Sequence, residues 1–173
     1  MKKLVLVLVF MFILAIGAFA EHPGGWGIGI VGQSHFFGNE LAGNWGGALS
    51  LKAPQKPIFW GINARIKNNY FGVSVTGDYY LIDKRLIPDI NFGWYLGIGG
   101  YAGFYHVGGD GNYNGLGVGA RVPIGIYVFP VRFFEVFIDL APSLGLGVNF
   151  GDEIGLKIPA GGLGADLGVR FWL

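Results

Sequence analysis

Seven charged residues of this sequence occupy positions that alternate with hydrocarbon side chains, and they are the first candidates for chemistry. Successive side chains of an extended strand point to opposite faces, so strict alternation separates a charged face from an apolar face. All seven charged side chains fall on the face opposite the apolar one, so they would share one interior. They are Arg65, Asp78, Arg121, Glu135, Asp139, Asp166 and Arg170.

Several of these charges are expected to meet. The strand that holds Arg121 folds back onto the strand that holds Asp139, and the last strand brings Arg170 to the same place. We therefore predict one cluster of Arg121, Asp139 and Arg170, with Glu135 and Asp166 as its outer members. Such a cluster would act either as a proton or ion relay, or as a structural ion network that holds the strands together. We favour the structural network, because charges in a filled interior need partners.

Acyl transfer by a Ser, a His and an acid is the other chemistry to consider. The histidines are His22, His35 and His106. His22 lies near the amino end, and the other two fall in predicted loops, where we expect exposed side chains. The inward Ser74 and Ser143 have no histidine nearby on the same face of the predicted sheet, although His106 caps a strand. The sequence therefore predicts no catalytic site.

The glycine-rich stretches also predict no cofactor or metal site. Gly-Gly-Asp-Gly at 108–111 is a fragment of a calcium loop without the repeats that would support it, so we expect a flexible turn. The glycines at 97–100 are not followed by a helix, so they do not form a phosphate-binding loop.

Strands of about ten residues must position the charged side chains. The clearest strand is the last, where Leu163, Ala165, Leu167, Val169 and Phe171 alternate with small or charged residues. The same pattern recurs upstream at the length that a tilted membrane-spanning strand requires. The even number of strands lets both chain ends lie on the same side of a membrane. The predicted strands are 25–32, 45–52, 58–66, 70–81, 90–105, 115–129, 134–148 and 163–173.

Composition supports a membrane protein that crosses with strands. Hydrophobic residues make up 52% of the chain, yet after the first twenty residues no apolar run approaches the length of a spanning helix. Outward-facing aromatic residues fall near strand ends, where rings meet lipid headgroups, whereas strand centres are aliphatic. The sequence therefore predicts an all-β fold: an eight-stranded, antiparallel, up-and-down transmembrane β-barrel. The outward rings are Trp26, Trp60, Tyr79, Phe92, Trp94, Phe134 and Phe171 toward one end, and Trp45, Phe71 and Phe104 toward the other.

The amino terminus predicts an export signal. Two lysines are followed by an apolar run at 4–16 and by small residues before Glu21. We assign 1–20 to a signal peptide and 21–173 to the barrel, with the cell outer membrane as its location. Without Lys2 and Lys3, ten basic residues remain against eleven acidic ones, which gives no electrostatic footprint for nucleic acid. The absence of cysteine excludes a disulfide framework and a lipid-modified cysteine.

Glycine and proline set the expected interior. A barrel of eight strands is just wide enough for side chains to fill it, so the inward tyrosines and phenylalanines need glycine neighbours. The 33 glycines therefore predict a filled lumen and no open pore. Pro123 and Pro142 lie inside predicted strands, where each removes a hydrogen-bond donor, so we expect β-bulges there.

The outer loops are the expected contact surface. With the amino end in the periplasm, the longer outer loops are 33–44, 106–114 and 149–161. Exposed rings on loops often anchor a partner, and Phe36, Phe37 and Tyr113 are the candidates. The two phenylalanines would equally well pack against the rim.

Five segments resemble a family of small spirochaete-type outer-membrane β-barrel proteins. More distantly, the layout is similar to the membrane domain of OmpA and to OmpX. The resemblance implies an eight-stranded barrel with surface exposure and, for some members, adhesion to host proteins; it carries over no catalytic residue. The segments are GDYYLIDK (77–84), GWYLGIGGY (93–101), ARVPIGIYVFP (120–130), FFEVFIDLAPSLGL (133–146) and GGLGADLGVRFWL (161–173).

These observations lead to one functional expectation and three alternatives. We expect a monomeric, non-enzymatic, integral outer-membrane barrel that contacts lipid, displays surface loops, and has a structural or host-factor-binding role. The alternatives are a narrow ion or solute channel, a lipid A-modifying enzyme that uses His106, and a soluble periplasmic barrel.

Overall fold

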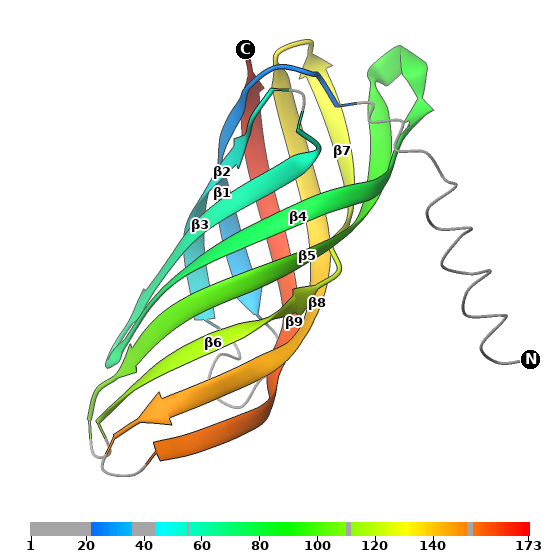
Figure 1. Cartoon of the computed structure of the whole chain (residues 1–173). Coiled ribbons are helices and arrows are strands. Elements are labelled where there is room, and N and C mark those ends of the chain that lie inside the picture. Colours follow the sequence, from blue (N-terminus) through cyan, green and yellow to red (C-terminus); the bar gives the residue numbers. More distant parts are fainter. Residues whose placement is uncertain (1–21, 36–43, 55, 110–111, 152–153) are drawn as a thin grey trace, which may run out of the picture.

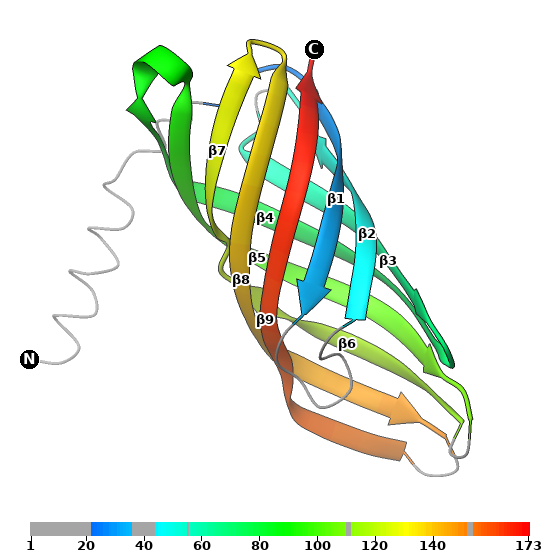
Figure 2. The same ribbon diagram turned by 180° about the vertical axis from the view of Figure 1, so that it is seen from behind.

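The computed structural model describes residues 22–35, 44–54, 56–109, 112–151 and 154–173. Within these ranges the fold is all-β, with strands and one short 3₁₀-helix, η1, at Pro88–Ile90. All strand pairs are antiparallel, and the sheet returns to its first strand to form a ring of eight strand positions (Figures 1 and 2). The all-β, eight-position prediction is therefore confirmed. No helix among the described residues is long and apolar enough to cross a membrane.

The strands follow one another around the ring in chain order, and β9 pairs with β1. The strands β6 and β7 lie end to end and together fill one of the eight positions, since both pair with β5 and with β8. The strands are β1 (Gly27–His35), β2 (Asn44–Lys52), β3 (Ile58–Lys67), β4 (Tyr70–Ile87), β5 (Phe92–Val107), β6 (Tyr113–Arg121), β7 (Ile124–Val131), β8 (Phe134–Phe150) and β9 (Ile154–Trp172).

The two prolines act differently from the predicted bulges. Pro123 divides one long strand into β6 and β7, and its carbonyl still accepts a hydrogen bond from the Gly97 N–H at 2.8 Å. Pro142 lies inside β8 in regular register with Leu163, so the bulge expected there is wrong. Its carbonyl accepts the Val122 N–H at 3.0 Å. The prolines therefore lie beside the same gap in the ladder, which limits the donors that the sheet loses.

Most strands are longer than the sequence predicted, so the predicted connections are too long. The segment 149–161 is mostly strand, because β8 runs to Phe150 and β9 begins at Ile154. The segments 33–44 and 106–114 also lose residues to strands at both ends, and β4 continues through most of 82–89. Polar residues and glycines mark loops in a soluble sheet, but here they also line the inner face of the ring, so composition alone misplaced the strand ends.

A bulge in β4 explains one error in side-chain orientation. Tyr80 pairs with Gly97 and Ile82 pairs with Leu96, which leaves Leu81 as an extra residue. An extra residue shifts the alternation by one position, so Asp83 points into the ring and is buried. The sequence prediction ended this strand at Leu81 and therefore missed a lumenal carboxylate.

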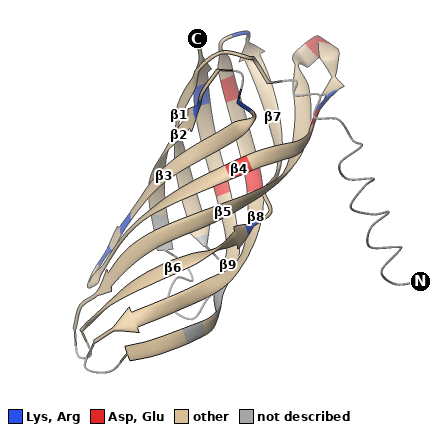
Figure 3. Ribbon diagram, viewed as in Figure 1, with Lys and Arg blue, Asp and Glu red and all other residues tan. Residues whose placement is uncertain are grey.

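The outer surface of the ring is aliphatic over the strand centres. Ile30 is 64% exposed and Leu167 is 60% exposed, whereas the alternating residues on the same strands are largely buried. Figure 3 shows that few positions along the strands are Lys, Arg, Asp or Glu, and the acidic residues of the strand centres, Asp78, Asp139 and Asp166, are buried. The residues of this aliphatic surface include Ile28, Ile30, Leu49, Ile62, Val73, Val75, Ile98, Val118, Ile124, Ile126, Ile138, Leu140 and Leu167.

The interior has two unlike halves. The half nearer the two ends of the described chain, here called the filled half, is packed with aromatic rings: Tyr95 and Tyr127 are 0% and 1% exposed. The other half, here called the glycine-rich half, is lined by inward glycines of β5, β6 and β8, and its Tyr101 and Tyr105 are only partly buried. The predicted filling by side chains therefore describes one half of the interior.

Alanine substitution should have opposite effects on stability at two glycines, Gly125 of β7 and Gly117 of β6, which lie in the same one of the eight strand positions. A Cβ at Gly125, in the filled half, would meet the Tyr95 ring and lie 2.7 Å from the Asp139 Cβ. A Cβ at Gly117, in the glycine-rich half, would meet nothing closer than 3.9 Å. We expect Gly125→Ala to lower the free energy of unfolding by about 1–3 kcal/mol through overpacking. We expect Gly117→Ala to be neutral or to stabilise by up to about 1 kcal/mol.

Denaturant titration of both variants beside the parent chain measures this difference. Equal destabilisation by the two alanines would contradict the division of the interior into a filled and a glycine-rich half.

Candidate functional site in the ring interior

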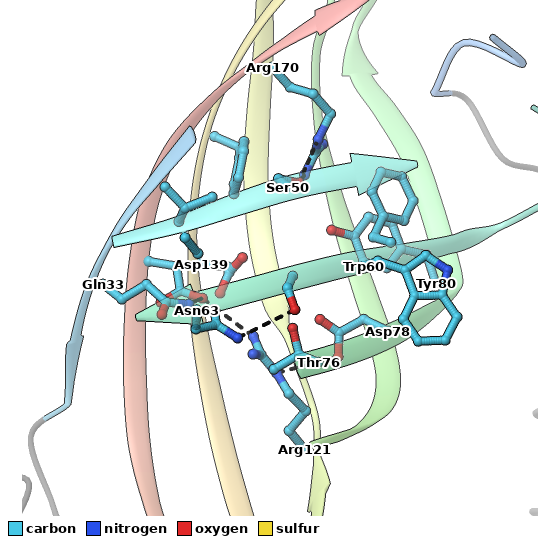
Figure 4. Close-up of a pocket in the computed structure, with 16 residues that line it drawn as sticks. Gln33, Ser50, Trp60, Asn63, Thr76, Asp78, Tyr80, Arg121, Asp139 and Arg170 are labelled. Atoms are coloured by element: carbon cyan, nitrogen blue, oxygen red, sulfur yellow. Dashed lines mark hydrogen bonds and ion pairs between the residues drawn. The ribbon is translucent and has the colours of Figure 1, made fainter. Parts of the chain in front are cut away.

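A polar cavity of about 40 Å³ lies inside the ring. Residues from seven of the eight strand positions line it, and Figure 4 shows that they converge from opposite walls. Its charged lining residues come from β4, β6, β8 and β9, so residues distant in sequence meet there. The polar and charged residues that line it are Gln33, Ser50, Asn63, Thr76, Asp78, Arg121, Asp139, Asp166 and Arg170.

Arg121 connects two walls of the cavity. Its Nε lies 3.3 Å from Asp78 Oδ1, and its Nη2 donates to Asp166 Oδ2 at 3.4 Å. The Gln33 amide also donates to Asp166 Oδ2, at 3.3 Å. These contacts join β1, β4, β6 and β9 across the interior. Backbone pairing connects only adjacent strands. We call Arg121, Asp78, Asp139 and Asp166 the acidic cluster.

Asp139 receives its hydrogen bond from a tyrosine. The Tyr95 hydroxyl donates to Asp139 Oδ2 at 2.7 Å. Asp139 and Asp166 are register partners on adjacent strands, so two carboxylates face the interior side by side. Like charges directly opposite in a sheet repel, and Arg121 offsets part of this repulsion.

Arg170 and Glu135 form a second group toward the filled half. Arg170 Nη1 donates to both Glu135 oxygens at 2.8 Å, and the Trp172 indole donates to Glu135 Oε2 at 2.7 Å. The Ser50 hydroxyl accepts from Arg170 Nε and Nη2 at 3.1 and 3.0 Å. Arg170 is 2% exposed and Glu135 is fully buried. Removal of one partner from such a buried pair costs about 3–5 kcal/mol, because the other charge is left uncompensated.

The guanidinium of Arg170 is also held between two rings. Its Cζ lies 4.7 Å from the Phe59 centroid and 4.4 Å from the Phe137 centroid. Cation–π contacts of this kind add to the ion pair, and burial of the guanidinium strengthens them. The aromatic residues of the filled half therefore stabilise this charge as well as filling space.

The five residues expected in one cluster all lie inside the ring, but they form two groups. Arg170 pairs with Glu135, and among the described residues it makes no ion pair with Asp139. The cause is register: Glu135 is opposite Arg170, and Asp139 is opposite Asp166, four residues further along β9. Four residues span about 13 Å of strand, beyond the reach of one ion pair. The sequence estimate crossed the predicted loop 149–161, which is mostly strand, and so misplaced Arg170.

His22 is the functional-site residue that sequence reasoning missed. The sequence analysis placed His22 only near the amino end, and the structure buries its side chain inside the ring. Its backbone N–H donates to Asp83 Oδ2 at 3.0 Å, and its Nδ1 lies 2.7 Å from the same oxygen. Its Nε2 lies 3.2 Å from Glu135 Oε1. Its proximity to the predicted signal cleavage site gave no indication that it enters the interior.

Six aromatic rings surround His22. The nearest is Tyr127, whose ring centroid lies 4.2 Å from that of the imidazole. Lys52 holds the same segment, because its Nζ donates to the Pro23 carbonyl at 2.9 Å. The segment that begins at His22 thus closes the filled half at the end where Trp26 and Leu173 exchange backbone hydrogen bonds. The other rings are Phe59, Tyr80, Tyr95, Phe129 and Trp172.

The carboxylates decide the charge of His22. Burial acts to lower the pKa of the imidazole, but Glu135 and Asp83 together outweigh it and raise the pKa above the ordinary value of 6.5. A protonated imidazole would donate from both nitrogens to the two carboxylates, which the observed geometry allows.

The other candidate residues are not brought into a catalytic arrangement. His106 Nδ1 lies 2.9 Å from the Asn114 amide oxygen at the exposed end of β5. The Ser143 hydroxyl bonds with the Gly162 backbone. Tyr113 begins β6 and packs edge-on against Tyr105, with a centroid distance of 6.3 Å. Phe36, Phe37 and the predicted signal peptide lie outside the described residues.

Neither a group of metal ligands nor a similarity to known proteins indicates a reaction for this site. Among the described residues, no three His, Cys, Asp or Glu side chains form a group suited to a metal ion. No protein-family model, curated protein or solved structure matches this sequence. The two groups form an internal network of ion pairs and hydrogen bonds.

The histidine should make stability depend on pH. Because the pKa of His22 is raised in the folded chain, its stabilising contribution is present below pH 6.5 and is lost as the pH rises through the folded-state pKa. We expect the difference in free energy of unfolding between the parent chain and His22→Gln to shrink over that rise. Denaturant titrations of both chains across this pH range measure this difference. Ionisable groups that both chains share contribute equally to the two values, so their protonation cancels in the difference. A difference that grows with pH would contradict the assignment.

Proposed function

We propose that this chain is an integral outer-membrane β-barrel that displays surface loops and has a structural or partner-binding role. The observation that carries the proposal is how the ring sorts its side chains: aliphatic residues lie outside, and Asp, Glu and Arg residues lie inside. A soluble ring would place the hydrocarbon inward. An Arg or Lys facing hydrocarbon at mid-depth costs about 2–4 kcal/mol, so this inversion is what a lipid environment requires.

The closed backbone ladder supports the same environment. A bilayer core offers no water to unpaired N–H and C=O groups, so only helices and closed sheets cross it. Here each of the eight strand positions has a partner on both sides. The strands are also long enough, since β3 has 10 residues and β5 has 16, against roughly 9–11 for one crossing.

The filled half supports a lumen without an open pore. Tyr95, Tyr127, Glu135 and Arg170 are almost completely buried across it, and His22 lies among them. An aqueous channel would need inward residues in contact with water along the full length. The glycine-rich half alone has that character, so the lumen resembles a vestibule closed at one end.

The chain ends and connections give the proposed orientation. Residues 22–26 lie beside Leu173, at the end of the ring that carries η1. Both ends of bacterial barrels lie in the periplasm, so we place this end there. The opposite ends of the strands, with the connections described at 68–69, 108–109, 112 and 151, then face outward. With residues 1–20 as an export signal, these connections are where we propose that a host or extracellular protein binds the monomer.

Labelling of single cysteines on intact cells tests the location and the orientation. The chain has no native cysteine, so Asn112→Cys and Asp89→Cys each introduce one reactive thiol on opposite ends of the ring. Both native residues are exposed. We expect a membrane-impermeant maleimide to label the cysteine at 112 on intact cells, and to label the cysteine at 89 only after the outer membrane is permeabilised.

The parent chain controls for background, and labelling of both cysteines in permeabilised cells controls for reactivity. Labelling at 89 but not at 112 on intact cells would contradict the orientation. Absence of both signals until permeabilisation, with the protein extracted without detergent, would favour a soluble periplasmic ring.

A further inference from the structure

The cavity contains more hydrogen-bond acceptors than the protein satisfies. Asn63 and Gln33 are 3% and 4% exposed, and their side-chain oxygens have no hydrogen-bond partner within the described chain. Their orientation is fixed, because Asn63 Nδ2 donates to the Ser74 carbonyl at 3.1 Å and Gln33 Nε2 donates to Asp166. Asp139 Oδ1 and Asp166 Oδ1 are likewise buried without a donor. Four acceptor oxygens, two from carboxamides and two from carboxylates, thus belong to residues that line one small cavity.

The acidic cluster also has an unbalanced charge. Asp78, Asp139 and Asp166 supply three carboxylates, whereas Arg121 and the nearby Arg65 supply two guanidinium groups. One negative charge therefore remains when all are ionised. An uncompensated charge in a buried site is costly, so the cavity favours one additional positive charge.

The second charged group lies four residues along β9 from the acidic cluster, so its charges act mainly on its own members. Glu135 and Asp83 face Arg170, Lys52 and His22, so the group carries one positive charge while the imidazole is protonated and none when it is neutral. Arg170 lines the cavity, but its Nη1 is committed to Glu135 and its other nitrogens to Ser50.

We propose that the cavity binds one small alkali cation, Na⁺ or K⁺, between the amide oxygens of Asn63 and Gln33 and the carboxylates of Asp139 and Asp166. One monovalent cation satisfies both deficits, because it neutralises the remaining charge and accepts the unpaired oxygens as ligands. Oxygen ligands are the ones that hard cations take. A divalent ion would reverse the charge imbalance, and the described residues offer no group of three acidic or histidine ligands for it.

Water or a proton would satisfy only part of these requirements. Water molecules donate hydrogen bonds to the four oxygens but leave the negative charge. A proton shared by Asp139 and Asp166 removes the charge but leaves the Asn63 and Gln33 oxygens without a partner. The cavity of about 40 Å³ has room for a cation with one or two waters.

The cation has a route to the site. The glycine-rich half lies on one side of the cavity, and its inward Tyr101, Gly117 and Ser143 are partly exposed to solvent. The filled half closes the other side, so exchange takes place through the glycine-rich half alone.

Thermal unfolding in different chloride salts tests the proposal. The full chain, in a neutral detergent at about pH 8 where free carboxyls are ionised, is melted in Na⁺, K⁺ or N-methylglucamine chloride at equal ionic strength. We expect the small cations to raise the melting temperature by roughly 3–6 °C at ten times the dissociation constant, with saturation. Asp139→Asn should remove this dependence, because it cancels the remaining negative charge.

Asp89→Asn is the matched control, since Asp89 is an exposed carboxylate in η1 and this variant should keep the full cation dependence.

If Asp139→Asn does not fold, sodium NMR line broadening by the parent chain, reversed by K⁺, decides the question. Equal melting in all salts without sodium broadening would overturn the proposal. So would a cation effect that Asp139→Asn retains. Equal melting in all salts with strong dependence on pH would assign the charge to a proton.

Discussion

The ion pair of Arg170 with Glu135 is the interaction on which the rest of the interior depends. It joins β8 to β9, and its remaining hydrogen-bonding groups bind Ser50 of β2 and the indole of Trp172. Through Glu135 it also holds His22, which reaches Asp83 of β4. One buried pair therefore ties together strands from opposite sides of the ring, whose outer surface beside it is aliphatic and aromatic.

The two halves of the interior solve the same steric problem in different ways. Eight strands enclose a space that a few large side chains fill, so each ring in the filled half needs a small neighbour. Tyr95 lies over Gly125, and Tyr127 lies over Gly93, where a Cβ would enter the ring. Beyond Arg121 the glycines continue, but only a few tyrosines accompany them, and space remains. The interior changes from the filled half to the glycine-rich half at the level where Pro123 divides β6 from β7.

The sequence predicted the alternation of faces well, because a period of two persists through glycine and proline alike. The inward orientation of Arg121, Glu135, Asp139, Asp166 and Arg170 follows from that period alone. Which of these residues meet depends on register across long connections, and neither a bulge at Leu81 nor a strand hidden in 149–161 has a local signal. His22 was missed for a related reason, since nothing in a short segment before the first strand indicates that it folds back into the interior.

The central claim is that the aliphatic face of the ring contacts lipid and that its polar face is enclosed. Nitroxide labels on β8, in protein reconstituted into bilayers, test this most directly through collision with oxygen, which concentrates in lipid, and with a nickel chelate, which stays in water. Labels at Leu140 and Leu144 point outward, and labels at Ser143 and Asn149 point into the glycine-rich half. This contact with lipid predicts high oxygen accessibility at the first two positions and high nickel accessibility at the second two. Nickel accessibility at Leu140 and Leu144 equal to that at Ser143 would contradict it.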